Sequence, residues 1–461
     1  MKNFINIPLP TQHKASFKDA DIRGVYPTEI NEVVAYRVAR AFVEEFGWTE
    51  VLVARDMRVS SPSLRKAFIA GIRDSGATAI DIGIIDTPGL YFASGSLDLP
   101  GVVITASHNP AEYNGLKLVS PGAIPLTGKT GLTAILKRIE KNASRTIRER
   151  GTLKKQSMMR KYVSYIKQQV KITTKKPLKV VIDAGNGTAG PLVKKLCANL
   201  PIDVTPLFFE LDGTFPNRES NPTLAKNQTE IKRTLKAGTY DFGVAFDGDA
   251  DRVAFFDEKG NYINSAFIGA LIAEHLLERF PKSTHIYTVF TSRAYEEAIK
   301  KSGGKAIRAR VGHAFIKEVM RKQDALFGCE HSAHFYFKDN YYTDSGILAF
   351  LFVAAAMAEK IGAEKKFSEF IKPFSTYFQT EEVLVEVKDK ELALQEIASR
   401  YESKHPESIT YFDGVTIHFP EYWFVIKKSV TEDALKFVVE SPKKQIAYTV
   451  QKEILEQLRI Y

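Results

Sequence analysis

An acidic repeat in the middle of the chain carries the residues best suited to metal chemistry. Residues 247–252 read Asp-Gly-Asp-Ala-Asp-Arg, with three carboxylates at alternate positions. In an extended segment alternate side chains point to one side, so these carboxylates lie together and repel one another unless a cation lies among them. Hard oxygen ligands suit Mg²⁺. The repeat predicts a magnesium site with Asp247, Asp249 and Asp251 as ligands, and with Arg252 beside it to neutralise phosphate charge.

Two other interpretations of this repeat are weaker. A calcium EF-hand is excluded because Arg252 occupies the sixth loop position, where glycine is required, although Glu258 falls at the twelfth. A solvated acidic turn is disfavoured because Phe246 precedes the repeat and the apolar run 253–256 follows it. Buried strands on both sides would fix the loop in one conformation, as a metal site requires.

A serine follows a buried strand earlier in the chain. Residues 102–105 are β-branched and predict a strand, which breaks at Ser107-His108-Asn109-Pro110. Pro110 cannot donate to a sheet, so the strand delivers Ser107 to a loop at its carboxyl end, where open α/β sheets bind ligands. Ser107 is thus a candidate to carry a covalent intermediate, and the acidic repeat supplies the cation that a phosphoserine needs. The alternative is an ordinary turn serine beside a proline.

Length and composition are typical of a globular protein, and the net positive charge favours an anionic partner. The chain has 461 residues and a formal net charge of +10. Its basic residues are scattered, which favours small phosphorylated substrates over nucleic acid. Cys197 and Cys329 form no disulfide framework, and the N-terminal residues contain no continuous apolar run typical of a secretory signal. The longest apolar run, 347–358, is too short to span a bilayer. We expect a cytoplasmic protein with no membrane partner.

Alternating strand and helix patterns predict parallel βαβ units over most of the chain. After about residue 370 the pattern changes to that of a small α+β domain. We expect domains at 1–153, 154–254, 255–370 and 371–461. The expected helices are 29–46, 61–72, 131–141, 158–170, 224–236, 265–279, 292–301, 313–322 and 390–401. The expected strands include 51–54, 79–85, 102–105, 179–182, 241–246, 253–256, 286–290, 381–387, 414–419 and 423–426.

A glycine motif offers a different function. Residues 185–190 match G-x-G-x-x-G between an expected strand and helix, and Glu210 lies at the distance of a ribose-binding acid. These features would suit a dinucleotide-dependent oxidoreductase. A tight strand-to-helix turn requires glycines without any cofactor, however, so the motif alone is weak.

Five motifs in order carry a family resemblance: residues 105–110 (TASHNP), 113–117 (YNGLK), 247–252 (DGDADR), 311–313 (VGH) and 328–334 (GCEHSAH). Together they resemble the α-D-phosphohexomutases, most of all the bacterial phosphomannomutase/phosphoglucomutases, over essentially the whole chain. The resemblance implies three related α/β domains with mixed sheets and a smaller C-terminal α+β domain, arranged around a central cleft.

The resemblance also implies an activity. Hexose 1-phosphate and hexose 6-phosphate of mannose, glucose or both would be interconverted through a phosphoserine at Ser107 and a hexose 1,6-bisphosphate, by a monomer or homodimer. The phosphoserine and the three aspartates would hold Mg²⁺. Lys117 matches the family's candidate base, for which we expect a lowered pKa, with phosphate binding as its alternative role. Arg23 and Arg252 would neutralise charge, and His108 would order the loop or assist proton transfer.

The remaining site residues follow from the same resemblance. Those expected to bind the substrate are His313, Glu330, Ser332, His334, Lys427, Lys428, Ser429 and Thr431.

Two motifs depart from the family pattern. Ala333 replaces a glycine, which would disturb the loop if its φ is positive. Lys427 replaces the arginine of the family's phosphate clamp, and a lysine is not equivalent at a bidentate site. We expect looser capture of the distal phosphate. Two alternative functions therefore remain: a phosphoglucosamine mutase, or a catalytically weak phosphosugar-binding relative.

Overall fold

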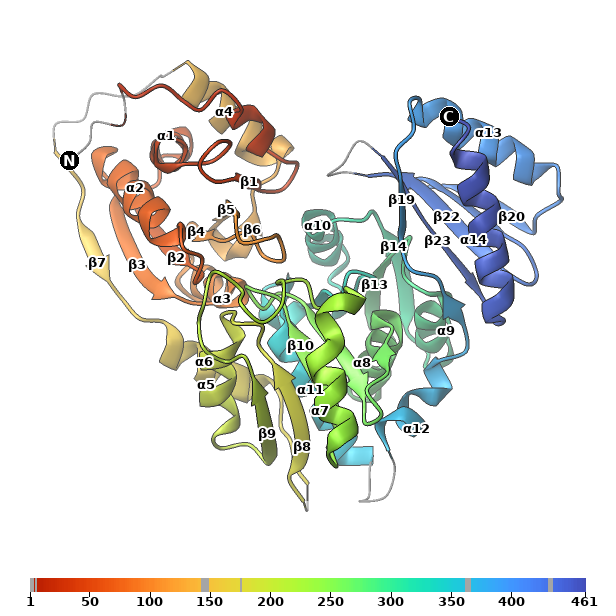
Figure 1. Cartoon of the computed structure of the whole chain (residues 1–461). Coiled ribbons are helices and arrows are strands. Elements are labelled where there is room, and N and C mark those ends of the chain that lie inside the picture. The colour runs from red at the N-terminus through yellow and green to blue at the C-terminus, as the bar shows by residue number, and fades with distance from the viewer. Residues whose placement is uncertain (1–3, 5, 142–148, 175, 361–365, 430–433) are drawn as a thin grey trace. The chain divides into compact units, whose positions relative to one another are not determined.

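The computed structural model describes the chain except residues 1–3, 5, 142–148, 175, 361–365 and 430–433 (Figure 1). The chain forms two compact units. The first contains residues 1–263 and 332–368, and the second contains 264–331 and 369–461. The chain leaves the first unit after Ile263, returns at Ser332 and leaves again after Ser368.

The N-terminal sheet of the first unit has the order β1-β5-β4-β2-β3-β7, with β6 paired to β5. The central strand β4 is parallel to β2 and antiparallel to β5, so the sheet is mixed, and Val103 lies opposite Lys117. This pairing brings the segment after β4 close to the lysine on β5. The strands are β1 (Ile22–Val25), β2 (Glu50–Arg55), β3 (Thr78–Ile84), β4 (Gly101–Ile104), β5 (Tyr113–Ser120), β6 (Ile124–Pro125) and β7 (Leu153–Lys155).

Four helices accompany this sheet: α1 (Glu32–Phe46), α2 (Ser61–Asp74), α3 (Thr87–Leu97) and α4 (Thr133–Glu140). The sequence does not predict helix α3, because Thr87-Pro88 is typical of the end of a strand. Asp86 instead caps the helix by accepting a hydrogen bond from the Gly89 amide, and Pro88 occupies the first turn, where its missing N–H costs nothing.

The second sheet of this unit has the order β12-β11-β10-β8-β9. Strands β8 and β10 are parallel, and β10 and β11 are antiparallel. All residues of β10 and β11 are buried, so the loop between them, which carries the acidic repeat, is fixed at both ends. The elements here are α5 (Met159–Gln169), β8 (Leu178–Asp183), α6 (Ala189–Cys197), β9 (Ile202–Leu207), α7 (Thr229–Ala237), β10 (Phe242–Phe246), β11 (Val253–Asp257) and β12 (Tyr262–Ile263).

A later segment of the chain, residues 332–368, also belongs to the first unit. Strands β16 (Phe335–Phe337) and β17 (Thr343–Asp344) pair antiparallel, and helix α11 (Gly346–Lys360) follows. The apolar run 347–358 is therefore a buried helix, as predicted. Over the residues that the structure describes, no helix has the length and apolar character needed to cross a membrane.

The second unit begins with α8 (Ser265–Arg279) and a parallel trio of strands in the order β14-β13-β15. Its further elements are β13 (Thr284–Thr288), α9 (Arg293–Lys301), β14 (Lys305–Ala309), α10 (His313–Gln323) and β15 (Phe327–Cys329). Helix α12 (Phe367–Ile371) spans the point at which the chain re-enters this unit.

An antiparallel sheet of order β18-β23-β22-β21-β20, with β19 on β23, closes the chain. Helices α13 (Lys390–Glu402) and α14 (Lys444–Leu458) share one apolar core with it, as the α+β prediction requires (Figure 1). The strands are β18 (Phe378–Gln379), β19 (Val383–Val385), β20 (Ser408–Tyr411), β21 (Val415–His418), β22 (Trp423–Lys428) and β23 (Leu435–Ser441). Short helical turns lie at η1 (His13–Ser16), η2 (Pro121–Ala123), η3 (Gly128–Leu132), η4 (Ala225–Gln228), η5 (Lys338–Asn340) and η6 (Lys372–Phe374).

Candidate active site

Ser107 lies in the loop between β4 and β5 and faces the acidic repeat. Its backbone has a φ of +50°, and the residue is 2% exposed. The Ser107 Oγ donates a hydrogen bond of 2.8 Å to Asp247 Oδ2, and His108 Nδ1 lies 3.3 Å from the same oxygen. The serine and the acidic repeat, which are far apart in sequence, thus lie side by side.

A fully buried arginine, Arg58, holds the serine loop. Its guanidinium donates to four backbone carbonyl oxygens at 2.6–2.9 Å, those of Ser107, Asn109, Pro110 and Tyr113. Asp56 lies 3.2 Å from its Nε and balances its charge. The sequence interpretation did not include Arg58, since one arginine after a strand carries no indication that it will be buried.

Ser220 joins the serine loop to the acidic loop. Its Oγ donates to the Ser107 carbonyl oxygen at 2.9 Å and accepts from the Gly248 amide at 2.8 Å. The residue is 1% exposed. It too was missed, because it lies in an irregular segment whose only sequence features are those of turns.

The three aspartates of the repeat fit a metal ion. One oxygen from each of Asp247, Asp249 and Asp251 lies within 4.8 Å of the others, and all three residues are buried. Asp249 Oδ1 is buried and has no hydrogen-bond donor among the residues that the structure describes. Burial, and then repulsion by Asp251 and Asp249, raise the pKa of Asp247 well above its usual range. An orphaned oxygen and three mutually repelling carboxylates form the donor set that Mg²⁺ prefers.

Lys117 lies among carboxylates. Its Nζ is 2.8 Å from Asp249 Oδ2 and 2.6 Å from Asp251 Oδ2. Burial opposes its protonation, but attraction to the two aspartates outweighs burial and raises the pKa of Lys117 well above its usual value. The prediction of a lowered pKa was wrong, because it assumed that cations would be its dominant neighbours. Burial likewise opposes ionisation of Asp251, but Lys117 and then His334 hold its pKa well below the usual range.

Arg23 and His108 complete the serine side of the site. Arg23 Nη1 donates to Asn109 Oδ1 at 2.8 Å, and its other terminal nitrogen pairs with Asp21. Burial, and then the positive charges of Arg252 and Arg23, lower the pKa of His108 well below its usual value. His108 is therefore neutral at pH 7 and can accept a proton or a hydrogen bond.

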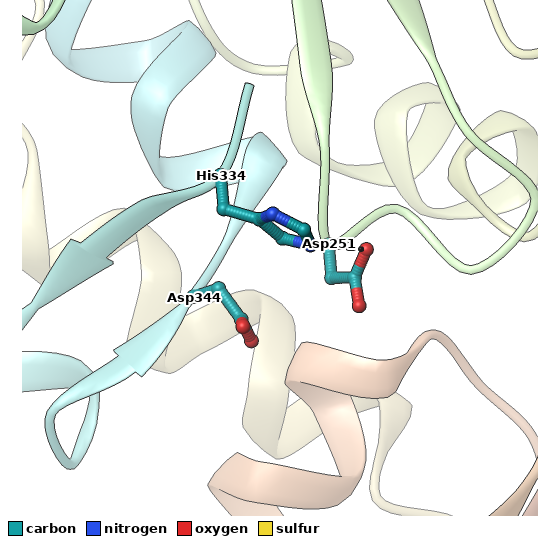
Figure 2. Close-up of side chains that lie close together, drawn as sticks. All are labelled: Asp251, His334 and Asp344. Carbon is teal, nitrogen blue, oxygen red and sulfur yellow. Dashed lines mark ion pairs between the residues drawn. The ribbon is translucent and has the colours of Figure 1, made fainter. Parts of the chain in front are cut away.

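His334 lies beside Asp251 of the acidic loop and beside Asp344 of β17 (Figure 2). Its Nε2 is 3.2 Å from Arg252 Nε and 3.5 Å from Asp251 Oδ1, and its Nδ1 is 2.9 Å from Ser332 Oγ. Potential ligand atoms of Asp251, His334 and Asp344 lie within 4.8 Å of one another. Both ring nitrogens of His334 have protein partners, which orient the ring and disfavour a second metal site here.

Ala333 lies between Ser332 and His334 in the position where the family pattern has glycine. Its φ is +67° and it is fully buried. The Ala333 carbonyl oxygen accepts a hydrogen bond of 3.2 Å from the Val253 amide, which attaches this loop to the strand after the acidic repeat. The predicted conflict between a methyl group and a left-handed backbone is therefore present.

The other sugar-binding candidates lie in the second unit. His313 begins helix α10, and Glu330 is buried and accepts a hydrogen bond of 3.2 Å from the Gly312 amide. The structure thus fixes the Glu330 carboxylate by the loop that precedes His313. The chain passes to the first unit between His331 and Ser332.

The clamp residues lie at the end of β22 in the second unit. Lys427 is buried and its Nζ donates to Asp413 Oδ2 at 2.6 Å, whereas the exposed Lys428 pairs with Glu391. The Ser429 amide donates to the Ala434 carbonyl oxygen. Thr431, the last predicted clamp residue, lies outside the described residues.

The glycine motif at 185–190 has a structural explanation. A Cβ on residue 187 would lie 2.8 Å from the Gly248 carbonyl oxygen, and the Thr188 amide donates to that same oxygen. A Cβ on residue 190 would lie 2.3 Å from the carbonyl oxygen of Phe209. Gly187 allows close packing against the acidic loop and Gly190 against the backbone at Phe209, so nothing here favours the dinucleotide interpretation.

Comparisons with known proteins identify the family. Family profiles described as phosphoglucomutase/phosphomannomutase alpha/beta/alpha domains I, II and III match residues 14–146, 160–260 and 264–377. A phosphomannomutase of Vibrio cholerae is 36% identical over 448 residues, which cover 94% of this chain and 95% of that protein. A phosphomannomutase of Escherichia coli K12 is 35% identical over 434 residues, with 92% and 94% covered.

Solved structures give the same result. A phosphoglucomutase/phosphomannomutase family protein of Burkholderia thailandensis superposes with a TM-score of 0.88 at 29% identity, covering 97% of both chains. The phosphoglucomutase parafusin of Paramecium shares the fold, with a TM-score of 0.78 at 17% identity, covering 98% of this chain and 94% of that one. With the serine, the acidic loop and the matched α/β domains in place, the chain belongs to the phosphoglucomutase/phosphomannomutase family.

Proposed function

We propose that the protein is a phosphohexomutase that interconverts hexose 1-phosphate and hexose 6-phosphate of mannose, glucose or both, in the cytoplasm. A phosphoryl group on Ser107 would pass to the free hydroxyl of the sugar phosphate to give a hexose 1,6-bisphosphate, which then returns its other phosphoryl group to the serine. The observation that carries the proposal is the 2.8 Å hydrogen bond from Ser107 Oγ to Asp247 beside two further buried carboxylates.

Asp247, Asp249 and Asp251 of the acidic loop would hold Mg²⁺ together with the phosphoserine at Ser107. When bound, Mg²⁺ supplies positive charge that offsets the carboxylates and the phosphoryl oxygens, and so weakens the attraction that keeps the proton on Lys117. Phosphoryl transfer depends mainly on positioning and charge neutralisation, which the buried Arg58 and Ser220 support by fixing the two loops.

Proton transfer falls to groups near Ser107. The sugar hydroxyl must lose a proton as its oxygen bonds to phosphorus and the Ser107 oxygen leaves. The neutral His108, 3.3 Å from Ser107 Oγ, is one acceptor. Lys117 is the other candidate base, and it must first lose the proton that Asp249 and Asp251 stabilise on it. Arg23 and Arg252 would bind the transferring phosphoryl oxygens.

Recognition of the sugar and its distal phosphate is assigned to the residues that the family resemblance indicates. Glu330 and Ser332 would bond ring hydroxyls, and His313 and His334 would support them. The cationic and hydroxyl groups proposed for the distal phosphate are Lys427, Lys428, Ser429 and Thr431.

Intact mass spectrometry tests the proposal directly. After incubation with Mg²⁺ and glucose 1,6-bisphosphate, the protein should gain one phosphoryl group, and Ser107→Ala should gain none. Ser63→Ala, which removes a hydroxyl in the first turn of helix α2 that donates to the Ser60 carbonyl oxygen, should load like the unchanged protein. A phosphoryl group retained by Ser107→Ala would contradict the proposal.

Activity assays complete the test. We expect turnover of mannose 1-phosphate, glucose 1-phosphate or both, in a reaction that Ser107→Ala abolishes. Turnover of glucosamine phosphate alone would identify the alternative mutase, and loading without turnover would identify the catalytically weak relative.

A further inference from the structure

A carboxylate of the chain itself occupies the region proposed to bind the distal phosphate. Asp413 Oδ2 accepts hydrogen bonds of 2.6 Å from Lys427 Nζ and 2.8 Å from the Val311 amide. Arg310 Nε lies 3.6 Å from Asp413 Oδ1. The side chains of Asp413 and Lys427 are only 8% and 5% exposed. Two cations and a backbone amide thus converge on one anion, an arrangement that also suits a phosphate oxygen.

The hairpin turn between β20 and β21 fixes Asp413 in this position. Asp413 and Gly414 have φ values of +51° and +119°. A Cβ on residue 414 would lie 2.4 Å from the Ile426 carbonyl oxygen and 2.6 Å from Lys427 Cβ, so only glycine allows the turn to pack on β22. Asp413 itself adopts the left-handed conformation, which is uncommon for a residue other than glycine, and this turn places its carboxylate on the lysine.

The same loop connects Asp413 to the proposed sugar site. The Val311 amide donates to Asp413, and the next amide, that of Gly312, donates to Glu330 Oε1 at 3.2 Å. A change in the charge held by Asp413 therefore acts where the phosphosugar is proposed to bind.

We propose that Asp413 is a resident anion of the distal phosphate site, which competes with the substrate's phosphate for Lys427 and Arg310 and so sets the affinity for phosphosugars. This inference rests on the proposed function. A phosphate dianion gains the full attraction of Lys427 only where the like charge of Asp413 is withdrawn or neutralised. An arginine at 427 would present five donors in a planar fork and serve two anions at once, whereas the compact lysine ammonium makes the competition direct.

The test is Asp413→Asn, which removes the charge and keeps the shape. Asparagine tolerates a positive φ, and its Oδ1 can still accept the Val311 and Lys427 hydrogen bonds, so the turn should be preserved. Asp413→Gly removes the carboxylate at a φ that glycine favours, and serves if the first variant does not fold. Glu421→Gln makes the same change of net charge at an exposed pair with Lys443 and is the matched control.

We expect the KM for glucose 1-phosphate or mannose 1-phosphate to fall about tenfold in Asp413→Asn, with no rise in kcat, and to stay unchanged in Glu421→Gln. Calorimetric titration with inorganic phosphate should show tighter binding to the variant by a similar factor, and added salt should reduce the difference. An unchanged or raised KM together with unchanged or weaker phosphate binding would overturn the proposal, because it would make Asp413 a structural tie only. If the unchanged protein has no mutase activity, the proposed function fails, while the phosphate titration still decides the role of Asp413.

Discussion

Ser220 holds the carbonyl oxygen of Ser107 by a hydrogen bond of 2.9 Å, and the same hydroxyl accepts the Gly248 amide at 2.8 Å. One buried side chain thereby fixes the distance between the serine that would carry the phosphoryl group and the loop that would hold the metal ion. The two loops come from different sheets, so their position relative to one another depends on such hydrogen bonds.

Ser220→Ala should lower both stability and activity. The variant leaves the buried Gly248 amide without its acceptor, which costs about 1–3 kcal/mol. We expect the free energy of unfolding in urea to fall by this amount, and the loading of Ser107 from glucose 1,6-bisphosphate to slow at least tenfold. Ser63→Ala, on a half-exposed helix turn, should change neither quantity measurably. Equal loading rates in both variants would show that the bridge is not needed for phosphoryl transfer.

Ala333→Gly should leave the free energy of unfolding within about 1 kcal/mol of the unchanged value. Relief of the left-handed backbone gains about 1–2 kcal/mol. This gain is offset by about 0.5–1 kcal/mol of glycine entropy and about 0.8 kcal/mol of lost methyl burial. Ala41→Gly in helix α1 has no strain to relieve, so it should cost about 1.3–1.8 kcal/mol. A gain above 2 kcal/mol at position 333 would show that the methyl group distorts the His334 loop.

Asp86 should make the protein less stable as pH rises. Burial is the main cause that raises the pKa of this carboxyl to about 8, and Tyr162 donates to it at 3.2 Å. The folded state keeps a proton that the unfolded chain, with an ordinary pKa near 3.8, releases. The stabilisation is complete below pH 4 and is lost as pH rises through 8, with a slope of up to about 1.4 kcal/mol per pH unit.

Asp86→Asn removes this dependence and keeps the helix cap, since asparagine also caps helices. Urea unfolding between pH 5 and 8 should show a flatter profile for the variant. Asp212→Asn is the control, because hydrogen bonds from Thr214 lower the pKa of that exposed carboxyl and its titration falls outside this range. Parallel profiles for Asp86→Asn and the unchanged protein would contradict the assignment.

Mg²⁺ should raise the melting temperature by relieving repulsion among the three aspartates. At a concentration of 100 times Kd, binding adds about 2.7 kcal/mol to the free energy of unfolding. Asp249→Asn should reduce this shift, because it removes a ligand and part of the repulsion together. Asp98→Asn, at an exposed helix end, should retain the full shift. Equal Mg²⁺ shifts in the two variants would place the cation elsewhere.

The chemistry of the site was predictable because the residues that would perform it lie in short, recognisable segments of the sequence. Asp247, Asp249 and Asp251 alternate on one short loop between apolar strands, and Ser107 follows another strand directly. Such patterns depend on backbone periodicity, which acts over a few residues. The same reasoning predicted the buried helix at 347–358 and the α+β character of the last domain. The four domain boundaries stay a prediction.

Tertiary structure alone decided how these groups behave. The charge on a side chain depends on which groups surround it in space, so Lys117 acquired a raised pKa from Asp249 and Asp251, and the expected lowering was wrong. Arg58 and Ser220 bind backbone atoms of distant loops, and no spacing of residues in the sequence predicts such contacts. Local patterns determined which groups are present, whereas burial and long-range packing determined their protonation, their partners and the anion that Lys427 holds.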